Sequence, residues 1–376
     1  MYEGSGDQFY QSDWIFDNES FNRPFVITTT HRLLMTIFSN YHADKLKLAS
    51  FRNSLLIIDE VQTIPKHFLE TLIHILEKMF QFLNTRTIFV SATIPHELRS
   101  LPTTNVSNEH IQFYIDLTKK RVSYLPWSQV EIKKGKTLVM ANTRRKAATI
   151  YQKLLNKFPD AMYLSTGIRK KDRTEALHRI RSKTGSNDLF TLVSTQVVEA
   201  GVDISFSHIF RERAPLDSIV QVMGRLNREA ENDQAELVVF DYDDEPRPYT
   251  QLELNESENI LRVVGNSIDL YSRLDEYYQS VWKKNMVAKT HSQELDYYIS
   301  TLNFNKIWEF VGKLLEDEKD PVLIPDPGDW DKVKDLLMKN NRLTKKDYRT
   351  FSNITASMPG KVDDLRIKKI ISILMC

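Results

Sequence analysis

The sequence predicts an α/β protein with two parallel-sheet units and a helical region after them. Short apolar runs alternate with segments that repeat apolar residues at helical spacing, and this rhythm restarts after a polar, Pro-containing stretch at 101–135. From about residue 246 the pattern changes to long, aromatic-rich helical segments. A chain of 376 residues suits two or three domains of roughly 100 to 200 residues. We therefore predict domains at 1–105, 106–245 and 246–376.

In the first unit, the apolar runs 25–28, 54–58 and 86–90 are the expected strands. Between the last two, KHFLETLIHILEKMFQFL at 66–83 has the spacing of an amphipathic helix. Apolar strands that alternate with such helices are typical of a parallel sheet covered on both faces.

The second unit repeats this alternation. We expect strands at TLVMA (137–141), AMYLS (161–165), LFTLVS (189–194), SHIF (207–210) and AELVVF (235–240), with helices that begin at Thr143, Arg169 and Leu216. After it, 266–285 and 301–315 are predicted helices. The chain ends on the apolar segment KKIISILMC (368–376) without a polar tail, so we expect a partial C-terminal domain.

Composition excludes several classes of protein. The charges nearly cancel, with 51 basic and 50 acidic residues, so any nucleic-acid binding must come from local clusters. Cys376 is the single cysteine, which argues against a disulfide framework or a cysteine metal site. The N-terminal residues have no signal-peptide pattern, and no apolar run approaches the ~20 residues that span a bilayer. We expect a soluble, cytoplasmic protein that does not bind membranes.

Two carboxylates close an expected strand in SLLIIDEVQTIP (54–65). In a phosphate-cleaving site, the first carboxylate, here Asp59, holds Mg²⁺, and the second, Glu60, orients and deprotonates water. SAT, from Ser91 to Thr93, ends the next strand, so its hydroxyls should lie at the same sheet edge, where ligands bind in open α/β sheets. Carboxylates at strand ends also simply cap helices, and SAT alone is compatible with an ordinary turn.

STQVVEAGVDISF (194–206) marks a second candidate site. Ser194 and Thr195 end a strand, and Gly201 and Asp203 follow in the next turn. Hydroxyls and backbone N–H groups at such a turn suit phosphate or sugar contacts, and Asp203 can accept a hydrogen bond from a ribose hydroxyl. The alternative is an ordinary turn with a capping Asp.

DSIVQVMGRLNRE (217–229) opens an expected helix on which Gln221, Arg225 and Arg228 fall at i, i+4 and i+7. This spacing puts them on one helical face. With Gly224 allowing close approach, the two guanidinium groups and the amide fit the clamping of a transferring phosphoryl group, as an arginine finger does. A solvated arginine face paired with Glu229 is the alternative.

Taken in order and spacing, these segments resemble the motifs of superfamily 2 helicases. Motifs II to VI are matched by IIDEVQ (57–62), SAT (91–93), NTRRKA (142–147), STQVVEAGVDISF (194–206) and QVMGRLNR (221–228). The segments DEVQTIP, VVEAGVDISF and GRLNR most resemble the helicase part of the CRISPR-associated helicase-nuclease family of type I systems. FVITTTHRLL (25–34) is similar to that family's motif Ib. The resemblance covers about 25–245 with specific motifs, and extends to about 325 with weaker ones.

The resemblance implies two RecA-like domains, the first N-terminally truncated, followed by a helical linker and a partial C-terminal domain. ATP and Mg²⁺ are the implied cofactors, with Asp59 as the metal ligand, and ATP hydrolysis would step the protein along single-stranded DNA in antiviral interference. An RNA-guided CRISPR surveillance complex is the implied partner. Residue by residue, it implies catalysis by Asp59, Glu60, Gln221, Arg225 and Arg228, nucleotide contacts by Gly201 and Asp203, coupling by Ser91 and Thr93, and DNA contacts by Thr29, Thr30, Asn142, Thr143, Arg144, Thr166, Ser194 and Thr195.

The sequence departs from this family in two respects. The phosphate loop, or Walker A motif, needs two glycines five positions apart, and none of the 11 glycines forms such a pair. Gly135, Lys136 and Thr137 mimic the end of that motif but lead into an expected strand, whereas a phosphate loop leads into a helix. No histidine is followed by Asp, as the family's nuclease requires. We expect a fragment whose nuclease and phosphate loop lie upstream, which alone does not hydrolyse ATP and leaves apolar faces around SLLII and TIFV partly uncovered.

Two other functions remain open. A DNA-repair or restriction helicase of the same superfamily fits the same motifs and would lack nuclease and RNA-guided complex genes nearby. A non-catalytic truncated protein that binds DNA or a partner fits the missing phosphate loop.

Overall fold

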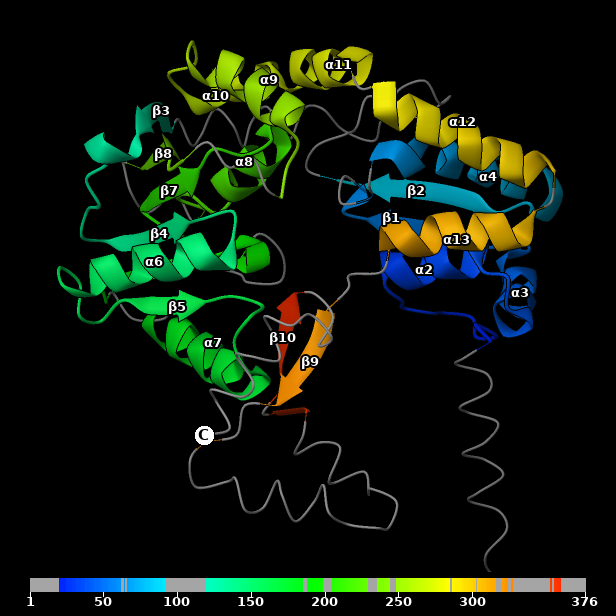
Figure 1. Cartoon of the computed structure of the whole chain (residues 1–376), viewed down its shortest axis with the longest axis horizontal. Helices are drawn as coiled ribbons and strands as arrows, with labels where there is room; N and C mark the ends of the chain where they lie inside the picture. Colours follow the sequence, from blue (N-terminus) through cyan, green and yellow to red (C-terminus); the bar gives the residue numbers. More distant parts are fainter. Residues whose placement is uncertain are drawn as a thin grey trace, which may run out of the picture. The chain divides into compact units, whose positions relative to one another are not determined.

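The computed structural model divides the chain into two compact units (Figure 1). The first comprises Met1–Thr104 with Trp282–Asp317, and the second Asn105–Val281 with Glu318–Cys376. The structure describes residues 20–61, 64, 66–91, 120–184, 188–198, 204–228, 235–243, 248–284, 286–301, 303–315, 319–323, 326, 352–353 and 355–359.

A βαβ element forms the centre of the first unit. β1 (Leu55–Asp59) and β2 (Arg86–Val90) pair in parallel, and α4 (Lys66–Leu83) connects them. The expected strand–helix–strand order at 54–90 is thus confirmed. Before it come α2 (Thr30–Phe38), α3 (His42–Leu48) and the 3₁₀ turn η1 (Ala49–Phe51).

Two helices from late in the sequence complete this unit. α12 (Met286–Ser300) packs along α4, and α13 (Phe304–Leu315) packs against α2. Leu295, Ile307 and Val311 from these helices are buried in the same core as α2 and α4. The sequence analysis placed both helices in a region of their own, because an amphipathic pattern shows that a helix has an apolar face but not what covers it.

Only one face of the β1–β2 sheet is covered in the described part of the chain. Ile58 is 2% exposed beneath the helices, whereas Leu55, Ile57, Ile88 and Val90 are 45–57% exposed on the other face. Side chains alternate between the two faces of a strand, so these four form one apolar surface. The expectation of partly uncovered faces around SLLII and TIFV is confirmed, and the expectation of a sheet covered on both faces is wrong for this unit.

The expected strand at 25–28 is not formed. These residues have no strand pairing in the structure, and Phe25 and Ile27 are 80% and 84% exposed. A strand needs a neighbour for its backbone N–H and C=O groups, and none of the described residues supplies one here. The helix expected after it is present as α2, with Thr29 as its N-cap.

The second unit contains a six-stranded parallel sheet in the order β3-β8-β7-β4-β6-β5. Its strands are β3 (Arg121–Pro126), β4 (Lys136–Met140), β5 (Met162–Leu164), β6 (Phe190–Ser194), β7 (His208–Glu212) and β8 (Glu236–Asp241). Its helices include α6 (Arg144–Leu155), α7 (Lys170–Thr184) and α8 (Leu216–Met223), and η4 (Trp127–Gln129) and η5 (Gln196–Val198) are 3₁₀ turns. All five predicted strands are confirmed, and β3 was missed within the Pro-containing stretch, where it forms an edge strand that ends on Pro126. The α/β fold class with parallel sheets is thus confirmed.

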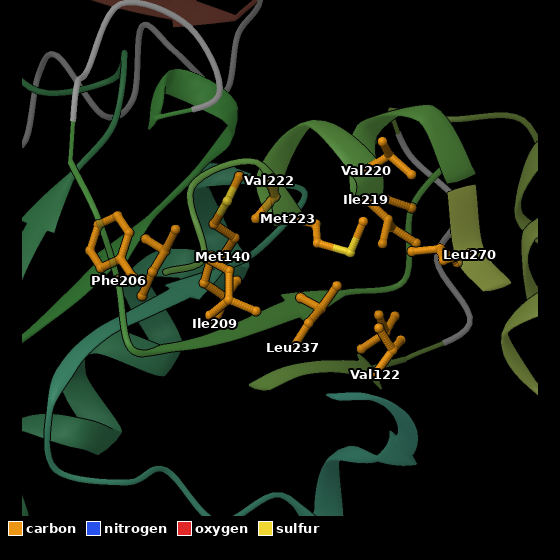
Figure 2. Close-up of a cluster of buried hydrophobic side chains, with 14 of the residues drawn as sticks. Val122, Met140, Phe206, Ile209, Ile219, Val220, Val222, Met223, Leu237 and Leu270 are labelled. Atoms are coloured by element: carbon orange, nitrogen blue, oxygen red, sulfur yellow. The ribbon is translucent and has the colours of Figure 1, made fainter. Parts of the chain in front are cut away.

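Both faces of this sheet are covered. Leu138 and Met140 of β4 belong to one buried cluster, and Val139 belongs to the other. Figure 2 shows the first cluster, with Met140, Ile209 and Leu237 from the strands beneath Ile219 and Met223 of α8. The buried, apolar strands and the helices on each side agree with the pattern expected of a parallel sheet.

After the sheet, the chain forms α9 (Gln251–Leu261), α10 (Ser267–Ser272) and α11 (Leu274–Lys284). β9 (Lys319–Leu323) and β10 (Thr355–Pro359) then pair antiparallel. The helices predicted at 266–285 and 301–315 are confirmed where they are described, whereas β9 and β10 are strands in a region expected to be helical. Residues 368–376 lie outside the described residues. Within the described ranges, every helix is too short or too polar to cross a bilayer.

Candidate functional site

Two carboxylates and a hydroxyl lie at the carboxyl edge of the first sheet. Asp59 is the last residue of β1 and pairs with Val90 of β2, so Ser91 follows at the same edge. Asp59 and Glu60 are both exposed. The predicted placement of Asp59, Glu60 and Ser91 is confirmed, whereas Thr93 lies outside the described residues.

Glu60 adopts a left-handed backbone conformation with a φ of 54°. A residue with a Cβ pays about 1 kcal/mol or more for this conformation, and such strain is concentrated at functional sites. Asp59 Oδ1 accepts a hydrogen bond from the Glu60 backbone N–H at 3.0 Å, which stabilises the tight turn. The turn places two successive, exposed carboxylates at the end of β1.

The carboxylate chemistry at this edge fits a hard divalent cation. Mg²⁺ is usually bound through one or two carboxylates, with water and phosphate oxygens as its other ligands, and exposed Asp59 offers such a carboxylate. In the described part of the chain, no group of three or more His, Cys, Asp or Glu side chains forms a metal cage. Asp59 therefore suits an ion that arrives with phosphate.

Thr29 and Thr30 lie at the start of α2. The Thr29 side chain accepts a hydrogen bond from the Arg32 backbone N–H at 3.1 Å and is exposed. N-capping by threonine typically stabilises a helix by ~1 kcal/mol. The capped N-terminus also presents backbone N–H groups of the kind that bind anions.

In the second unit, the predicted DNA-contacting residues lie at the carboxyl ends of three neighbouring strands. Residues 142–144 follow β4, Ser194 and Thr195 end β6, and Thr166 follows β5. Thr143 caps α6 by accepting a hydrogen bond from the Lys146 backbone N–H at 3.3 Å. The sequence placed these residues at strand ends, and the strand order β4-β6-β5 brings them together.

Asn142 faces inward from this edge. It is 5% exposed, its Nδ2 donates to the Arg213 carbonyl at 2.7 Å, and its Oδ1 accepts from Arg211 at 2.5 Å. Its backbone N–H donates to Glu212 Oε2 at 2.7 Å. Both ends of the Asn142 amide are engaged inside the protein, so in this conformation the side chain holds the loop in place and does not face a ligand.

Ser194 and Thr195 are buried in the same way, at 0% and 4% exposure. The Ser194 hydroxyl donates to the Leu164 carbonyl at 2.9 Å, and the Thr195 backbone N–H donates to the same carbonyl at 3.3 Å. These contacts join the end of β6 to β5 and fix the loop that carries Thr166. Thr166 itself is exposed.

Arg144 lies against Gly167, a residue that the sequence analysis did not select. A Cβ on Gly167 would lie 2.5 Å from Arg144 Cδ and 3.0 Å from its NH1. Only glycine therefore leaves room for this Arg144 conformation, which brings the guanidinium beside Gly167, the residue that follows Thr166. A glycine in the turn between an expected strand and an expected helix was the available signal.

The two motif arginines do not lie on a helix, which corrects the sequence expectation. α8 ends at Met223, and residues 224–228 form a turn, here called the arginine turn. Gly224 is the C-cap, and Asn227 has a left-handed φ of 46°. Gln221 is in the last helical turn, so Gln221, Arg225 and Arg228 do not share one helical face.

The arginine turn is held by the segment that precedes β7. Phe206 donates its backbone N–H to the Arg225 carbonyl at 2.9 Å and accepts from the Asn227 N–H at 2.8 Å. The Arg228 N–H donates to the Ser205 hydroxyl at 3.0 Å. These bonds replace the helical bonds that the sequence pattern suggested. Gly201 and Asp203 lie outside the described residues, but the residues directly after them contact the arginine turn.

A buried ionic network lies under the carboxyl edge and was not anticipated. Lys146 Nζ contacts Glu212 Oε1 at 2.7 Å and Asp243 Oδ1 at 2.5 Å. Burial lowers the pKa of Lys146, but its hydrogen bonds to Asp243 and Glu212 outweigh burial and raise the pKa. The Tyr249 hydroxyl accepts from Arg211 at 3.0 Å and from Gln196 at 3.2 Å. The network ties the ends of β4, β6, β7 and β8 together.

Gly135, Lys136 and Thr137 do not form a phosphate loop. Lys136 is the first residue of β4, so the segment leads into a strand as expected. Lys136 Nζ donates to the Thr184 carbonyl at 3.5 Å, at the end of α7. The segment lies at the amino edge of the sheet, opposite the carboxyl ends of β4, β5 and β6.

Two segments of this chain match the profiles of known protein families. A family profile described as DEAD/DEAH box helicase matches residues 6–101, and one described as CRISPR-associated nuclease/helicase Cas3, C-terminal, matches 133–231. Over these two segments the chain is similar to helicases and to CRISPR-associated nuclease/helicases. The resemblance predicted from the motifs is thereby confirmed.

A Cas3 protein of Haloferax volcanii is 24% identical over an alignment that covers 57% of this chain and 34% of that relative. A solved structure of T. fusca Cas3 with AMPPNP has a TM-score of 0.67 at 16% identity and covers 92% of this chain and 51% of that chain. A structure described as a CRISPR RNA-guided surveillance complex, pre-nicking, has a TM-score of 0.59 at 16% identity and covers 95% of this chain and 56% of that chain. At this identity, the structures show a shared fold. The chain spans between 34% and 45% of the length of three curated Cas3 relatives.

Proposed function

We propose that this chain supplies the DNA-tracking and phosphate-sensing residues of an ATP-dependent single-stranded-DNA translocase of CRISPR antiviral interference. The observation that carries the proposal is the cluster at the carboxyl ends of β4, β5 and β6 in the second unit. There the Thr143 cap, Arg144 and exposed Thr166 lie on a rigid support. The arginine turn, on the same unit, supplies guanidinium groups for a nucleotide.

The cluster is suited to a nucleic-acid backbone. Guanidinium, hydroxyl and backbone N–H groups bind phosphate oxygens without reading the base sequence. Arg144 and Thr166 make these contacts in our proposal, while buried Asn142, Ser194 and Thr195 keep the strand ends in register. The Thr29–Thr30 helix start makes the corresponding contact from the first unit.

ATP is the proposed nucleotide. Asp59 would hold its Mg²⁺, which would supply positive charge at the phosphates, and Glu60 would accept a proton from water as the water oxygen bonds to the terminal phosphorus and the bond to the ADP oxygen breaks. Ser91 and Thr93 respond to the nucleotide state. Gln221, Arg225 and Arg228 reach the terminal phosphate, with Gly201 and Asp203 near the sugar. The phosphate loop, absent from the printed sequence, is proposed to come from polypeptide outside these residues.

The partners are proposed on the same basis. Single-stranded DNA is the track, and an RNA-guided surveillance complex exposes it, a pairing supported by the similarity to the chain in the surveillance-complex structure. A nuclease segment elsewhere in the parent protein would degrade the strand in the cytoplasm. A repair or restriction helicase would share this chemistry, and the neighbouring genes distinguish it.

Titration of labelled oligonucleotides tests the DNA-binding part. We expect single strands to bind better than duplex, and affinity to fall about five- to twentyfold between 50 and 200 mM salt, as two or three neutralised phosphates imply. Arg144→Ala should weaken binding several-fold more than Arg145→Ala. This neighbouring substitution removes the same charge from an exposed side chain. Equal affinity at both salt concentrations, a strong base preference, or equal effects of the two variants contradicts the proposal.

A non-catalytic protein that only binds DNA is the second candidate. The observation that favours it is the course of residues 135–137, which enter β4 and do not form a phosphate loop. It predicts the same DNA binding, but no ATP hydrolysis in any longer form of the protein.

A further inference from the structure

Lys120 places a buried ammonium group at the end of α8. The residue directly precedes β3 and is 6% exposed, and its Nζ donates to the Met223 carbonyl at 3.2 Å. Met223 is the last residue of α8 and is itself fully buried. The arginine turn begins at the next residue. The ammonium therefore lies one peptide away from the segment that carries Arg225 and Arg228.

The Met223 carbonyl accepts two hydrogen bonds. One comes from Lys120 Nζ, and the other from the Leu226 backbone N–H at 3.0 Å. Leu226 also forms the bridge to Phe206 that anchors the arginine turn. The two donors fix the direction of the Met223 carbonyl, and that direction sets where the helix stops and how the arginine turn leaves it.

The backbone of Lys120 is held in place as well. Its N–H donates to the Ser267 hydroxyl at 3.2 Å, and its carbonyl accepts from the Ser267 N–H at 3.0 Å. Two residues on, the Val122 N–H donates to the Gly265 carbonyl at 3.1 Å. With its backbone pinned to the start of α10, the Lys120 side chain reaches Met223 from a fixed origin.

A buried charged group at this position disfavours the folded state. Burial lowers the pKa of Lys120 to about 8, which shows that the folded protein disfavours the ammonium form. An apolar side chain of similar length at this position would avoid this penalty. Met223, whose carbonyl the ammonium contacts, belongs to the buried apolar cluster of Figure 2. What the ammonium adds is attraction to the partial negative charge of a helix C-terminus, at the helix that leads into the arginine turn.

We propose that Lys120 is a positioning residue for the arginine turn, and that its ammonium fixes the exit of residues 224–228 from α8. The positioning itself does not depend on the activity of the protein. Its use, to aim Arg225 and Arg228 at a phosphate, rests on the function proposed above.

Hydrogen exchange of the 376-residue chain tests the positioning directly. Lys120→Met keeps the length of the side chain and removes the donor. We expect the amides of Arg225, Leu226 and Asn227 to exchange about tenfold faster than in the unmodified chain, as the loss of a hydrogen bond from a charged donor implies. The buried amides of β4 should exchange at the same rate or more slowly, because an unfavourable buried charge has been removed. If Lys120 had a purely structural role, the substitution would change the exchange rates of the 225–227 amides and of the β4 amides in the same direction.

Lys136→Met is the matched control. Lys136 also donates its side-chain Nζ to the last carbonyl of a helix, Thr184 at the end of α7. Its backbone carbonyl, which the substitution leaves in place, accepts from the Ser207 N–H at 2.8 Å, beside the segment that holds the arginine turn. This variant should leave exchange at 225–227 unchanged. Lys120→Arg retains a charged donor, and exchange in the turn should stay within about threefold of the unmodified chain.

Three results overturn the proposal. They are unchanged or slower exchange at 225–227 in Lys120→Met, an equal increase in Lys136→Met, and an equal increase in Lys120→Arg. If Lys120→Met does not fold, Lys120→Leu is measured in its place, with the same expected increase in exchange at 225–227 and the same overturning result. None of these measurements involves ATP or DNA, so failure of the proposed function would leave them interpretable.

Discussion

For Arg228, the sequence pattern selected the residue but predicted the wrong backbone conformation around it. The pattern selected this arginine as a phosphate contact, and the structure leaves it exposed on the second unit. The helical spacing that grouped it with Gln221 and Arg225 is not realised, because Gly224 ends α8 and Phe206 pairs with the residues after it. A long-range backbone pairing of this kind has no signature in the spacing of nearby residues.

In a longer form of the protein that hydrolyses ATP, Arg228→Ala should reduce DNA-stimulated turnover by ~10³ to 10⁵, the usual effect of removing an arginine finger. Nucleotide binding should stay nearly intact. Steady-state phosphate release and a nucleotide titration measure the two quantities. Arg121→Ala, which removes an exposed arginine from the edge strand β3, serves as the control. More than a tenth of normal activity in Arg228→Ala would exclude the assignment.

Gly167 is a second residue whose role is visible only in the structure. Gly167→Ala would put a Cβ 2.5 Å from Arg144 Cδ, so the guanidinium must move. We expect this variant to weaken single-strand binding about as much as Arg144→Ala, and to add nothing further in an Arg144→Ala background, because both remove one interaction.

Gly265→Ala is the control for this cycle, since a Cβ there meets nothing within 4 Å. Additive losses from Gly167→Ala and Arg144→Ala would show that Gly167 acts through something other than Arg144. An unchanged affinity in Gly167→Ala would show that the Arg144 conformation is irrelevant to DNA binding.

At the scale of elements, most strands of the second unit followed from their apolar runs, because a strand covered on both faces is apolar throughout. β3 was missed because Pro126 and its polar surroundings resemble a loop, and an edge strand tolerates both. The run at 25–28 is equally apolar but does not form a strand. Apolar composition therefore identifies a segment that can pair, while the presence of a partner decides whether it does.

The uncovered face of β1 and β2 should promote self-association. Replacing Leu55 and Ile57, which are 56% and 57% exposed, with threonine keeps β-propensity and removes apolar surface. We expect the Leu55→Thr, Ile57→Thr double variant to raise the monomer fraction of the 376-residue chain in sedimentation velocity experiments.

A control double substitution at two other exposed apolar residues tests whether the effect is specific to the β1–β2 face or follows from any increase in surface polarity. Leu189 and Val263, in the second unit, are 64% and 66% exposed but do not lie on the β1–β2 sheet. The Leu189→Thr, Val263→Thr variant should leave self-association unchanged. Equal improvement by both variants would show that the β1–β2 face has no special part in it.

At the scale of the whole molecule, the chain returns to its first unit after building the second. α12 and α13 pack on α4 and α2, more than 200 residues away in sequence. α13 was expected from its amphipathic pattern at 301–315, whereas α12 falls between the two helices that were predicted. The surface that these helices cover could not be predicted, because any apolar helical face can cover any apolar surface of suitable size. The division into 1–105, 106–245 and 246–376 stays a prediction.

The most direct test of the function is phosphate release from ATP in the presence of single-stranded DNA. The 376-residue chain should be compared with a longer form that carries a phosphate loop upstream. Catalysis of phosphoryl transfer depends on positioning and charge stabilisation, so Asp59 and Glu60 alone should give no hydrolysis above background. The longer form should hydrolyse ATP in a DNA-dependent manner. Comparable hydrolysis by the two forms would contradict the proposal and mean that residues within this chain hold the phosphates.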